Sequence, residues 1–443
     1  MKVILPTSET AYGRHRNRVW KLVGRARRLR WDKVADRLSR PVGIARRLAD
    51  RAIHGSRYVN LPSHVLHPSH LSAWSIDPGL YPSPPAEESD ALELRAVPLR
   101  SGPRLLFPPY RYERPAPRLL GDSAFLAELE PWMRIRVGDD AGVGVVEAIL
   151  DRAILLRDAV YIASHDGVRS LYESARAADR GATVFPHPME LRTVRRLMTG
   201  PDPVFMGGIG GFNYGHFLTD DLTRLSLPRA DGTTEFLLTD HGGLMNSRRE
   251  ELLRIALAKH CFSVRFLPGD VPVEVAGLRY ASRASRHPVQ KSPDAVATMV
   301  DRVMAGLPER WRAGSVEKLL IARTGVERRG LTNLPEITAM LAERGFQVLD
   351  PMTASAAEQI AACAGARCIV GVMGAAMANT VFARPGADVV HLAPEGWLEP
   401  YYWDLAAVRG HRYTAVYGPA SGEGAPWMRP FHIDPADLRQ ALD

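Results

Sequence analysis

The feature that most constrains the fold is a regular alternation of apolar runs and amphipathic segments between residues 319 and 392. The apolar runs have the length of strands, and the segments between them have the periodicity of helices. Ser355 with Glu358 forms the pattern of a capping box, and Gly345 stands where a glycine ends a helix. The expected strands are 319–322, 346–349, 368–372 and 389–392, and the expected helices are 335–344 and 355–364. The pattern predicts βαβ units around a mostly parallel sheet.

An earlier series with the same alternation lies between residues 204 and 305. Its expected strands are 204–206, 236–238 and 264–267, and its expected helices are 214–227, 247–260 and 294–305. Pro228 ends the first of these helices, and Ser247 is a candidate cap for the second. The two series predict an α/β protein with two Rossmann-like domains, 119–307 and 308–443, that face a central cleft.

Composition places the chain among ordinary soluble globular proteins. It has 443 residues, of which 46% are hydrophobic and 24% charged, which excludes a chain disordered throughout and a disulfide-stapled scaffold. Three cysteines, at positions 261, 363 and 368, lack the spacing of a zinc site and favour a reducing compartment. The best candidate for a membrane span, the uncharged run 368–383, is shorter than the roughly 20 residues that a span needs. We therefore expect a cytoplasmic protein.

Positive charge is concentrated in a leader, residues 1–57. The leader holds 16 Lys and Arg against 4 Asp and Glu, a net +12, so the rest of the chain sums to −4 within the overall +8. Tryptophans at helical spacing among the arginines of residues 14–51 predict a peripheral anchor on an anionic membrane surface. A solvated basic arm, or a helix packed on the body, is the alternative. We expect no nucleic-acid partner, because no zinc-finger or RRM signature accompanies the charge.

Residues 58–118 contain twelve prolines. Because proline fixes φ and removes a backbone donor, we expect an extended segment that wraps over a surface or acts as a spacer.

The first segment with chemical potential is 207–224, where a glycine-rich turn leads into a helix. If the helix begins near Asn213, His216, Asp220 and Arg224 share one face at i, i+4 and i+8, and Asp221 points elsewhere. An imidazole held by a carboxylate that is itself tethered by a guanidinium is an oriented general base. The alternative is a cap, a surface salt bridge and a structural histidine.

The second segment follows the expected strand 319–322. Arg323 and Arg328 lie at the carboxyl end of this strand, where open α/β sheets bind ligands, and arginines can hold a diphosphate bidentately. A solvated basic loop is the alternative.

The third segment carries Gly374, Ala375 and Ala376 after the expected strand 368–372. A helix that begins there leaves its first backbone N–H groups open to an anion, although a tight packing turn has the same sequence pattern. Past the next strand, Glu395 is a candidate ligand of ribose hydroxyls and Trp397 of a base or sugar, with ordinary surface residues as the alternative.

In this order the three segments resemble glycosyltransferase family 61, over about residues 150–420. The family's Asn-Tyr-x-His helix, with an Asp and an Arg at following four-residue steps, is matched by Asn213, Tyr214, His216, Asp220 and Arg224. Its Ser-Arg, Arg-Arg and Asn-x-x-Glu pattern is matched by Arg323, Arg328, Arg329, Asn333 and Glu336, with Ala322 replacing the Ser. Its Gly-Ala run is matched by Gly371, Gly374, Ala375, Asn379, Phe382, Pro385 and Gly386.

The resemblance implies a GT-B fold and an inverting transfer from a nucleotide-sugar donor to a glycan or lipid-linked acceptor, in cell-surface polysaccharide biosynthesis. Asp220 or His216 is then the base, supported by Asn213 and Arg224. The donor residues are then Arg323, Arg328, Gly374, Ala375, Ala376, Asn379 and Glu395. The base helix and the donor turns must face each other across one gap between the domains.

Two features of the chain qualify this hypothesis. The family commonly has His where this chain has Met373, which suggests another donor, weaker binding or lost activity. The chain has no Asp-x-Asp, so we expect metal-independent chemistry with no cofactor besides the donor. The alternatives are a pyruvyltransferase acting on polysaccharide and an inactive glycan-binding protein.

Overall fold

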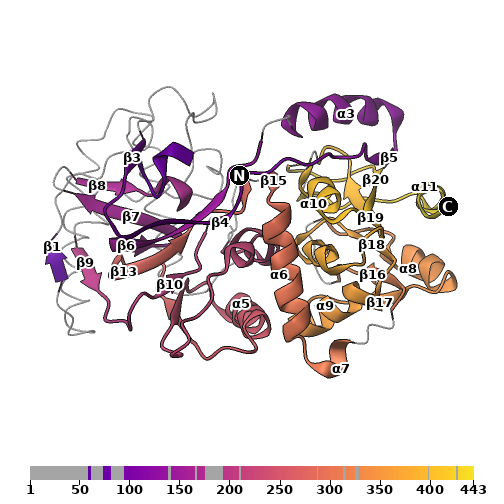
Figure 1. Cartoon of the computed structure of the whole chain (residues 1–443). Coiled ribbons are helices and arrows are strands. Elements are labelled where there is room, and N and C mark those ends of the chain that lie inside the picture. Colours follow the sequence, from indigo (N-terminus) through magenta and orange to yellow (C-terminus); the bar gives the residue numbers. More distant parts are fainter. Residues whose placement is uncertain are drawn as a thin grey trace.

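The computed structural model has two lobes with a long helix between them (Figure 1). It describes residues 58–60, 73–80, 94–137, 141–164, 167–174, 193–208, 211–286, 288–312, 316–324, 329–397, 399–425 and 428–443. The leader and Arg328 lie outside these residues. Each lobe is built on one sheet, and both sheets carry helices, so the mixed α/β prediction is confirmed and the lobes are consistent with Rossmann-like domains. No helix of the described ranges is long and apolar enough to cross a membrane.

The C-terminal lobe contains a six-stranded sheet in the order β17-β16-β18-β19-β20-β5, with every neighbouring pair parallel. Its strands are β5 (Arg118–Leu120), β16 (Lys318–Ile321), β17 (Gln347–Leu349), β18 (Cys368–Val372), β19 (Asp388–Pro394) and β20 (Arg412–Gly418). Its helices are α3 (Ser123–Val137), α7 (Glu309–Arg312), α8 (Leu334–Glu343), α9 (Ala356–Gly365), the 3₁₀ helix η9 (Ala375–Phe382), α10 (Tyr401–Arg409) and α11 (Pro435–Leu442). The strands and helices expected between residues 319 and 392 are confirmed, as is the parallel sheet.

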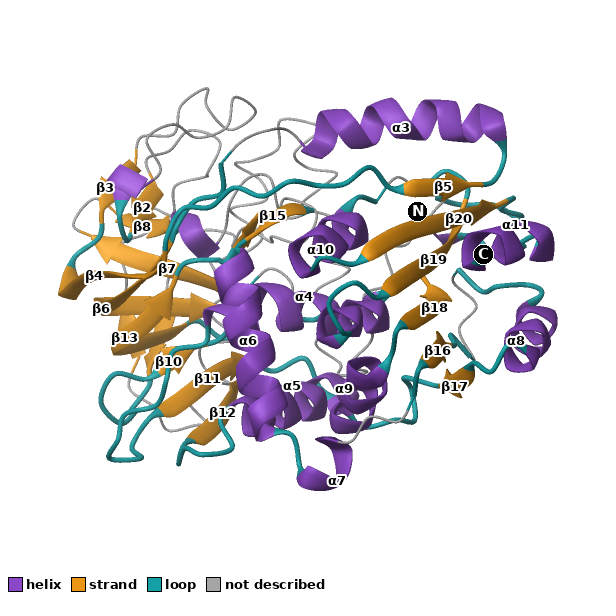
Figure 2. Ribbon diagram, turned by 45° about the vertical axis from the view of Figure 1, so that its right-hand side comes forward, coloured by secondary structure: helices purple, strands orange, loops and turns teal. Residues whose placement is uncertain are grey.

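Local sequence signals fix the ends of these helices. The Ser355 side chain accepts from the Glu358 amide while Glu358 accepts from the Ser355 amide, which completes the expected capping box. Gly345 follows α8 with φ +84°, a conformation that favours glycine. Helices α9 and α10 cover the sheet face toward the other lobe, and α8 and α11 cover the opposite face (Figure 2).

The N-terminal lobe contains a ten-stranded mixed sheet. Its strands are β1 (Tyr58–Asn60), β4 (Leu99–Phe107), β6 (Val145–Leu156), β7 (Ala159–Ser164), β8 (Gly167–Ser170), β9 (Thr193–Arg196), β10 (Val204–Phe205), β11 (Glu235–Thr239), β12 (Ser263–Leu267) and β13 (Val273–Ala281). Strands β12, β11, β10 and β13 are parallel neighbours, and β6 and β7 continue the sheet antiparallel. Shorter elements are η2 (Pro78–Leu80), η4 (Tyr172–Ser174) and the strand pairs β2 (Ala73–Ser75) with β3 (Leu94–Ala96) and β14 (Ser285–Arg286) with β15 (Val289–Lys291).

Two helical regions of this lobe matter for the site. The region expected at 214–227 consists of α4 (Tyr214–His216), a π turn η7 (Phe217–Asp221) and a 3₁₀ turn η8 (Leu222–Arg224). Helix α5 (Gly243–Ala256) begins earlier than expected, so Ser247 lies inside it and does not cap it. Helix α6 (Pro293–Gly306), capped by Ser292, stands between the lobes and confirms the helix expected at 294–305.

The proline-rich segment joins the two sheets. Strand β4 pairs with β6 in the N-terminal lobe, and β5, eleven residues further along the chain, pairs with β20 in the C-terminal lobe. Between them the chain runs extended along the molecule, and α3 then lies over the C-terminal lobe (Figure 1). The boundary expected at residue 118 therefore does not separate the two sheets, because the chain passes from the N-terminal lobe to the C-terminal lobe just before it.

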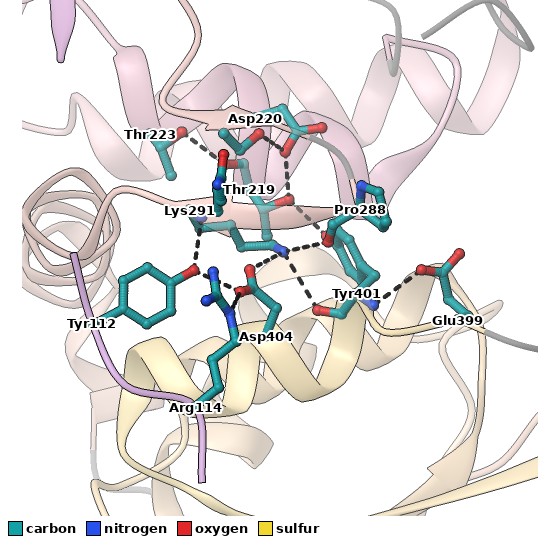
Figure 3. A network of polar contacts seen from close by, with 12 residues as sticks. Tyr112, Arg114, Thr219, Asp220, Thr223, Pro288, Lys291, Glu399, Tyr401 and Asp404 are labelled. Atoms are coloured by element: carbon teal, nitrogen blue, oxygen red, sulfur yellow. Dashed lines mark hydrogen bonds and ion pairs between the residues drawn. The ribbon is translucent and has the colours of Figure 1, made fainter. Parts of the chain in front are cut away.

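A buried ionic network anchors this crossing segment (Figure 3). The Asp404 carboxylate accepts hydrogen bonds from Tyr112 Oη at 2.6 Å, Arg114 Nε at 2.6 Å and Lys291 Nζ at 2.9 Å. Both Asp404 and Lys291 have at most 1% of their side chains exposed. Burial alone would raise the pKa of Asp404, but Lys291 and Arg114 hold it below its ordinary value. The stability it contributes is therefore present above the ordinary carboxyl pKa and is lost as pH falls through the lowered one.

We predict that Asp404→Asn lowers the free energy of unfolding by about 3 kcal/mol or more, because it leaves a buried lysine and arginine without their counter-charge. Asp388→Asn is the matched control: Asp388 pairs with Arg412 at 2.6 Å, but both side chains are well exposed, and about 1 kcal/mol or less is expected. Urea unfolding at pH 7 measures both. Equal losses in the two variants would contradict the importance of the buried network.

Candidate functional site

The C-terminal sheet has a topological switch point between β16 and β18. The chain leaves β16 toward β17 on one side and returns to β18 on the other, and ligands of open α/β sheets bind at the carboxyl ends beside such a point. Arg323 follows β16, and Gly374 follows β18. A Cβ built on Gly374 would lie 2.7 Å from Arg323 Nη1, so the guanidinium rests against this glycine. We call residues 322–324 and 373–376 the switch-point turns.

Backbone N–H groups add to the positive character of these turns. Gly374 precedes η9, whose first two residues, Ala375 and Ala376, are only partly buried. The first N–H groups of a helix have no intrahelical acceptor. The turns therefore combine a guanidinium with helix N–H groups, the two kinds of donor that bind phosphate oxygens.

Two side chains that the sequence reasoning did not select lie beside the turns. The Arg329 guanidinium stacks 4.4 Å above the centre of the Trp397 ring, so the expected stacking surface of Trp397 carries an arginine. Burial raises the pKa of the Tyr402 hydroxyl, which meets the backbone N–H of Gly374, while the charges of Arg329 and Arg323 act in the opposite direction. The resemblance includes Arg329, and this residue could have been selected from it.

Glu395 lies on the same sheet edge, where the charge of Asp122 acts on its carboxyl group. It follows β19, and its backbone N–H donates to Gly418 O at 2.9 Å. Burial and the charge of Asp122, beside α3, raise the pKa of its carboxyl group. The structure therefore brings Glu395 near the Asp122 carboxylate, and its expected contact with ribose stays a prediction.

The N-terminal lobe contributes a histidine–aspartate pair. Asn213 caps α4 by accepting from the Gly215 amide at 2.9 Å, and His216 Nδ1 lies 2.8 Å from Asp220 Oδ2. Ser285 Oγ and Thr219 Oγ1 donate to Asp220 Oδ1 at 2.5 and 3.1 Å. The side chains of His216 and Asp220 are 25% and 15% exposed, so both reach the surface. The predicted pair at i and i+4 is confirmed.

The environment of His216 favours its charged form. Desolvation, the largest effect, lowers the pKa of the imidazole, and Lys291 lowers it slightly. The hydrogen bond and charge of Asp220, with the charge of Glu399, outweigh both and raise the pKa above its ordinary value.

Arg224 does not tether Asp220, which corrects the expected three-residue face. The turn after Asp221 is the 3₁₀ turn η8, in which residues three apart align, so Arg224 lies over Asp221 and its Nη2 donates to Asp221 Oδ1 at 2.8 Å. Both side chains are at most 2% exposed. Asp221, expected to point elsewhere, is the partner of Arg224, and Arg224 supports the fold beneath the site.

Asn379 also has a different place from the one expected. It is 1% exposed; its Oδ1 accepts from the Tyr214 hydroxyl at 2.7 Å and its Nδ2 donates to Gln359 Oε1 at 2.9 Å. Both ends of the amide are therefore used within the protein. Asn379 joins α4 of one lobe to α9 of the other, so the structure does not support a direct contact of its side chain with a nucleotide-sugar donor.

The two lobes meet where helix α4, which carries His216, contacts the start of η9 in the second switch-point turn. A Cβ built on Gly215 would lie 3.2 Å from Ala375 O and 3.3 Å from Ala378 Cβ. His216, one residue further, therefore lies beside the start of η9, so α4 and the turn at 373–376 are in contact, while the expected gap between them stays a prediction. Met373 belongs to the second switch-point turn, but its side chain is fully buried in the apolar core. Within the described ranges, no group of three His, Cys, Asp or Glu side chains is arranged to hold a metal ion.

We predict that Asp220→Asn lowers the pKa of His216, because the substitution removes the charge that outweighs desolvation. A pH titration of the histidine ¹⁵N resonances, assigned with His216→Ala, measures the midpoint. Asp158→Asn is the matched control, since Asp158 pairs with a different histidine, His241, at 2.9 Å. A midpoint that stays in place in Asp220→Asn and moves in Asp158→Asn would contradict the assignment of the pair.

The comparisons with known proteins identify the segment that holds these residues. The model of the family Glycosyltransferase 61 matches residues 214–390, a range that begins at α4 and ends within β19. No curated protein matches the chain significantly. The matched range includes the histidine–aspartate pair and both switch-point turns, in the order that the resemblance required. The chain therefore carries a Glycosyltransferase 61 family domain, and membership of this family implies sugar transfer.

Proposed function

We propose that the protein is an inverting glycosyltransferase of GT-B type, which moves a sugar from a nucleotide-sugar donor to a hydroxyl of a glycan or lipid-linked acceptor. The observation that carries the proposal is the contact of α4 with η9, which sets His216 beside turns suited to a diphosphate. A single displacement needs a base for the acceptor proton and donors for the departing diphosphate. Residues for both tasks lie on the two sides of this contact.

We assign the base to His216 and the orienting role to Asp220. Both Asp220 oxygens accept hydrogen bonds within the protein, from His216, Thr219 and Ser285. A carboxylate with this many donors is a weaker base and a better anchor. The imidazole is the more exposed of the two side chains. It takes the acceptor proton as the hydroxyl oxygen attacks the anomeric carbon, and the bond from that carbon to the diphosphate breaks.

We assign the diphosphate to the switch-point turns. Arg323 and the N–H groups of Ala375 and Ala376 hold the charge that grows on the leaving group. Arg329, stacked on Trp397, supplies a second guanidinium at the same sheet edge. Aligned donors need no rearrangement during the reaction, which is why they favour the transition state.

The family resemblance supports a place in cell-surface polysaccharide biosynthesis, and the basic leader supports a position on the inner face of the membrane. Both are proposals. A sedimentation assay with anionic vesicles, comparing the full chain with a chain that lacks residues 1–57, tests the second.

We predict that substitutions on the two sides of the contact affect different steps: turnover on one side and nucleotide binding on the other. His216→Ala should lower turnover by about 10²-fold or more and leave nucleotide binding nearly unchanged, because it removes only the base. Arg323→Ala should weaken binding of UDP, GDP or TDP by about 10-fold or more, through loss of a charge-assisted contact. Arg367→Ala is the matched control, because Arg367 is 70% exposed and precedes β18 at the opposite sheet edge. Calorimetry and a donor-turnover assay separate these effects. Wild-type turnover in His216→Ala would exclude the assigned base.

We also predict that transfer continues in excess EDTA. The chain has no Asp-x-Asp to hold a metal–diphosphate complex, and the charge on the leaving group is met by arginine and backbone donors. The assay compares turnover in EDTA with turnover in added Mg²⁺ or Mn²⁺. Complete loss in EDTA, restored by either ion, would show that a metal takes part.

A further inference from the structure

Tyr401 lies between the buried ionic network and the histidine–aspartate pair. Its hydroxyl is 2.6 Å from Thr219 Oγ1, and Thr219 Oγ1 donates to Asp220 Oδ1 at 3.1 Å. Lys291 Nζ lies 4.2 Å from the centre of the Tyr401 ring and 3.4 Å from its carbonyl oxygen. Thr219 is fully buried and Tyr401 is 5% exposed, so water does not replace these contacts. Figure 3 shows the chain of contacts from Arg114 to Asp220.

We propose that Tyr401 is a positioning residue of the transferase site. The crossing segment at Tyr112 and Arg114 acts through Asp404 and Lys291 to hold the Tyr401 hydroxyl against Thr219. Thr219 in turn fixes the position of the Asp220 carboxylate, which orients His216. This inference rests on the proposed function for its effect on turnover. Its effect on the histidine itself is independent of any activity.

The direction of hydrogen bonding explains the coupling. Thr219 has one hydroxyl proton and two acceptors within reach, Asp220 Oδ1 and Gly215 O, both at 3.1 Å. Either hydroxyl could donate across the 2.6 Å contact of Tyr401 with Thr219, and Tyr401 Oη also lies 3.3 Å from Gly215 O. When Tyr401 donates to Thr219, the accepting hydroxyl becomes a better donor, which strengthens the bond from Thr219 to Asp220. Lys291 over the ring draws electron density from the phenol and favours the Tyr401 hydroxyl as donor.

Lys291 and Tyr401 keep their places because Asp404 holds them. Lys291 Nζ is a buried cation whose counter-charge is Asp404, and Tyr112 Oη both donates to Asp404 and accepts from the Lys291 amide at 3.0 Å. Tyr401 and Asp404 share helix α10, and Glu399 accepts from the Tyr401 amide at the start of that helix. The matched range 214–390 holds Lys291 but ends before α10 and begins after the crossing segment. The family domain is thus completed by residues on both sides of it.

The test is the titration midpoint of His216 in two conservative variants. The charged groups with the largest effect on this imidazole include Asp220, Glu399 and Lys291, with the Tyr401 ring 5.6 Å away, and neither variant changes a charge. Thr219→Val removes the donor to Asp220 Oδ1, and Tyr401→Phe removes the hydroxyl that supports that donor. With fewer donors, Asp220 holds the imidazolium more tightly, so the His216 pKa rises. We expect an upward shift of about 0.5 pH unit in Thr219→Val and a smaller one in Tyr401→Phe.

The control is Tyr417→Phe, which makes the same chemical change at another buried tyrosine, packed on Phe125. It should leave the His216 midpoint in place. Tyr112→Phe combined with Tyr401→Phe tests the longer route: if the crossing segment acts through Tyr401, the double variant titrates like Tyr401→Phe alone.

The outcomes separate this inference from the proposed function. Unchanged midpoints in both Thr219→Val and Tyr401→Phe would overturn the positioning role. If the midpoints rise and the acid limb of the pH profile of turnover moves to higher pH by the same amount, both the positioning role and the assigned base are supported. If the midpoints rise while the turnover profile stays in place, the positioning role stands and the assignment of His216 as the base fails.

Discussion

The site depends on one close approach, between the backbone of α4 at Gly215 and the backbone at the start of η9. A Cβ on Gly215 would lie 3.2 Å from the Ala375 carbonyl oxygen, so even the smallest side chain requires a neighbour to move by a few tenths of an ångström. On either side of this contact stand His216 and the first partly exposed N–H groups of η9. The amide of Asn379, held by Tyr214 and Gln359, maintains the approach. The candidate chemistry is thus a property of the junction, and neither lobe contains it alone.

The switch points of the two lobes are occupied differently. In the N-terminal sheet the order β12-β11-β10-β13 places a switch point between β10 and β13. Arg224 occupies it: Nη1 donates to Ala281 O at the end of β13, and Nη2 donates to Gly207 O after β10, both at 2.6 Å. In the C-terminal sheet the corresponding turns carry Arg323 and partly exposed backbone. A fold that offers two anion sites is therefore closed at one by its own guanidinium, which leaves the C-terminal lobe for the proposed donor.

How much of the structure the sequence could predict depended on how far apart in the chain the interacting residues lie. Strands and helices of the C-terminal lobe, the capping box at Ser355 and the glycine at 345 rest on neighbours within a few residues, and their positions were predicted. The pair of His216 with Asp220 is also local. The prediction for Arg224 was wrong because a helical pattern does not reveal a 3₁₀ turn, and in η8 the guanidinium aligns with Asp221, three residues earlier, and not with Asp220. The meander β6–β8 and strand β13 were missed, since their pairing is set by distant partners and not by a local period.

Lys291 and Asp404 show the limit of reading residues one segment at a time. Each is a charged residue in an unremarkable stretch of sequence, and 113 positions separate them. Burial of such a pair costs desolvation that its attraction barely offsets, so its stability alone gives little reason for it to be there. Geometry supplies a reason: the pair ties an extended segment, a hairpin at β15 and helix α10 into one fixed arrangement around Tyr401. An apolar substitute could fill the same volume but would not direct the tyrosine hydroxyl toward Thr219, and that direction is what links the outer segments of the chain to Asp220.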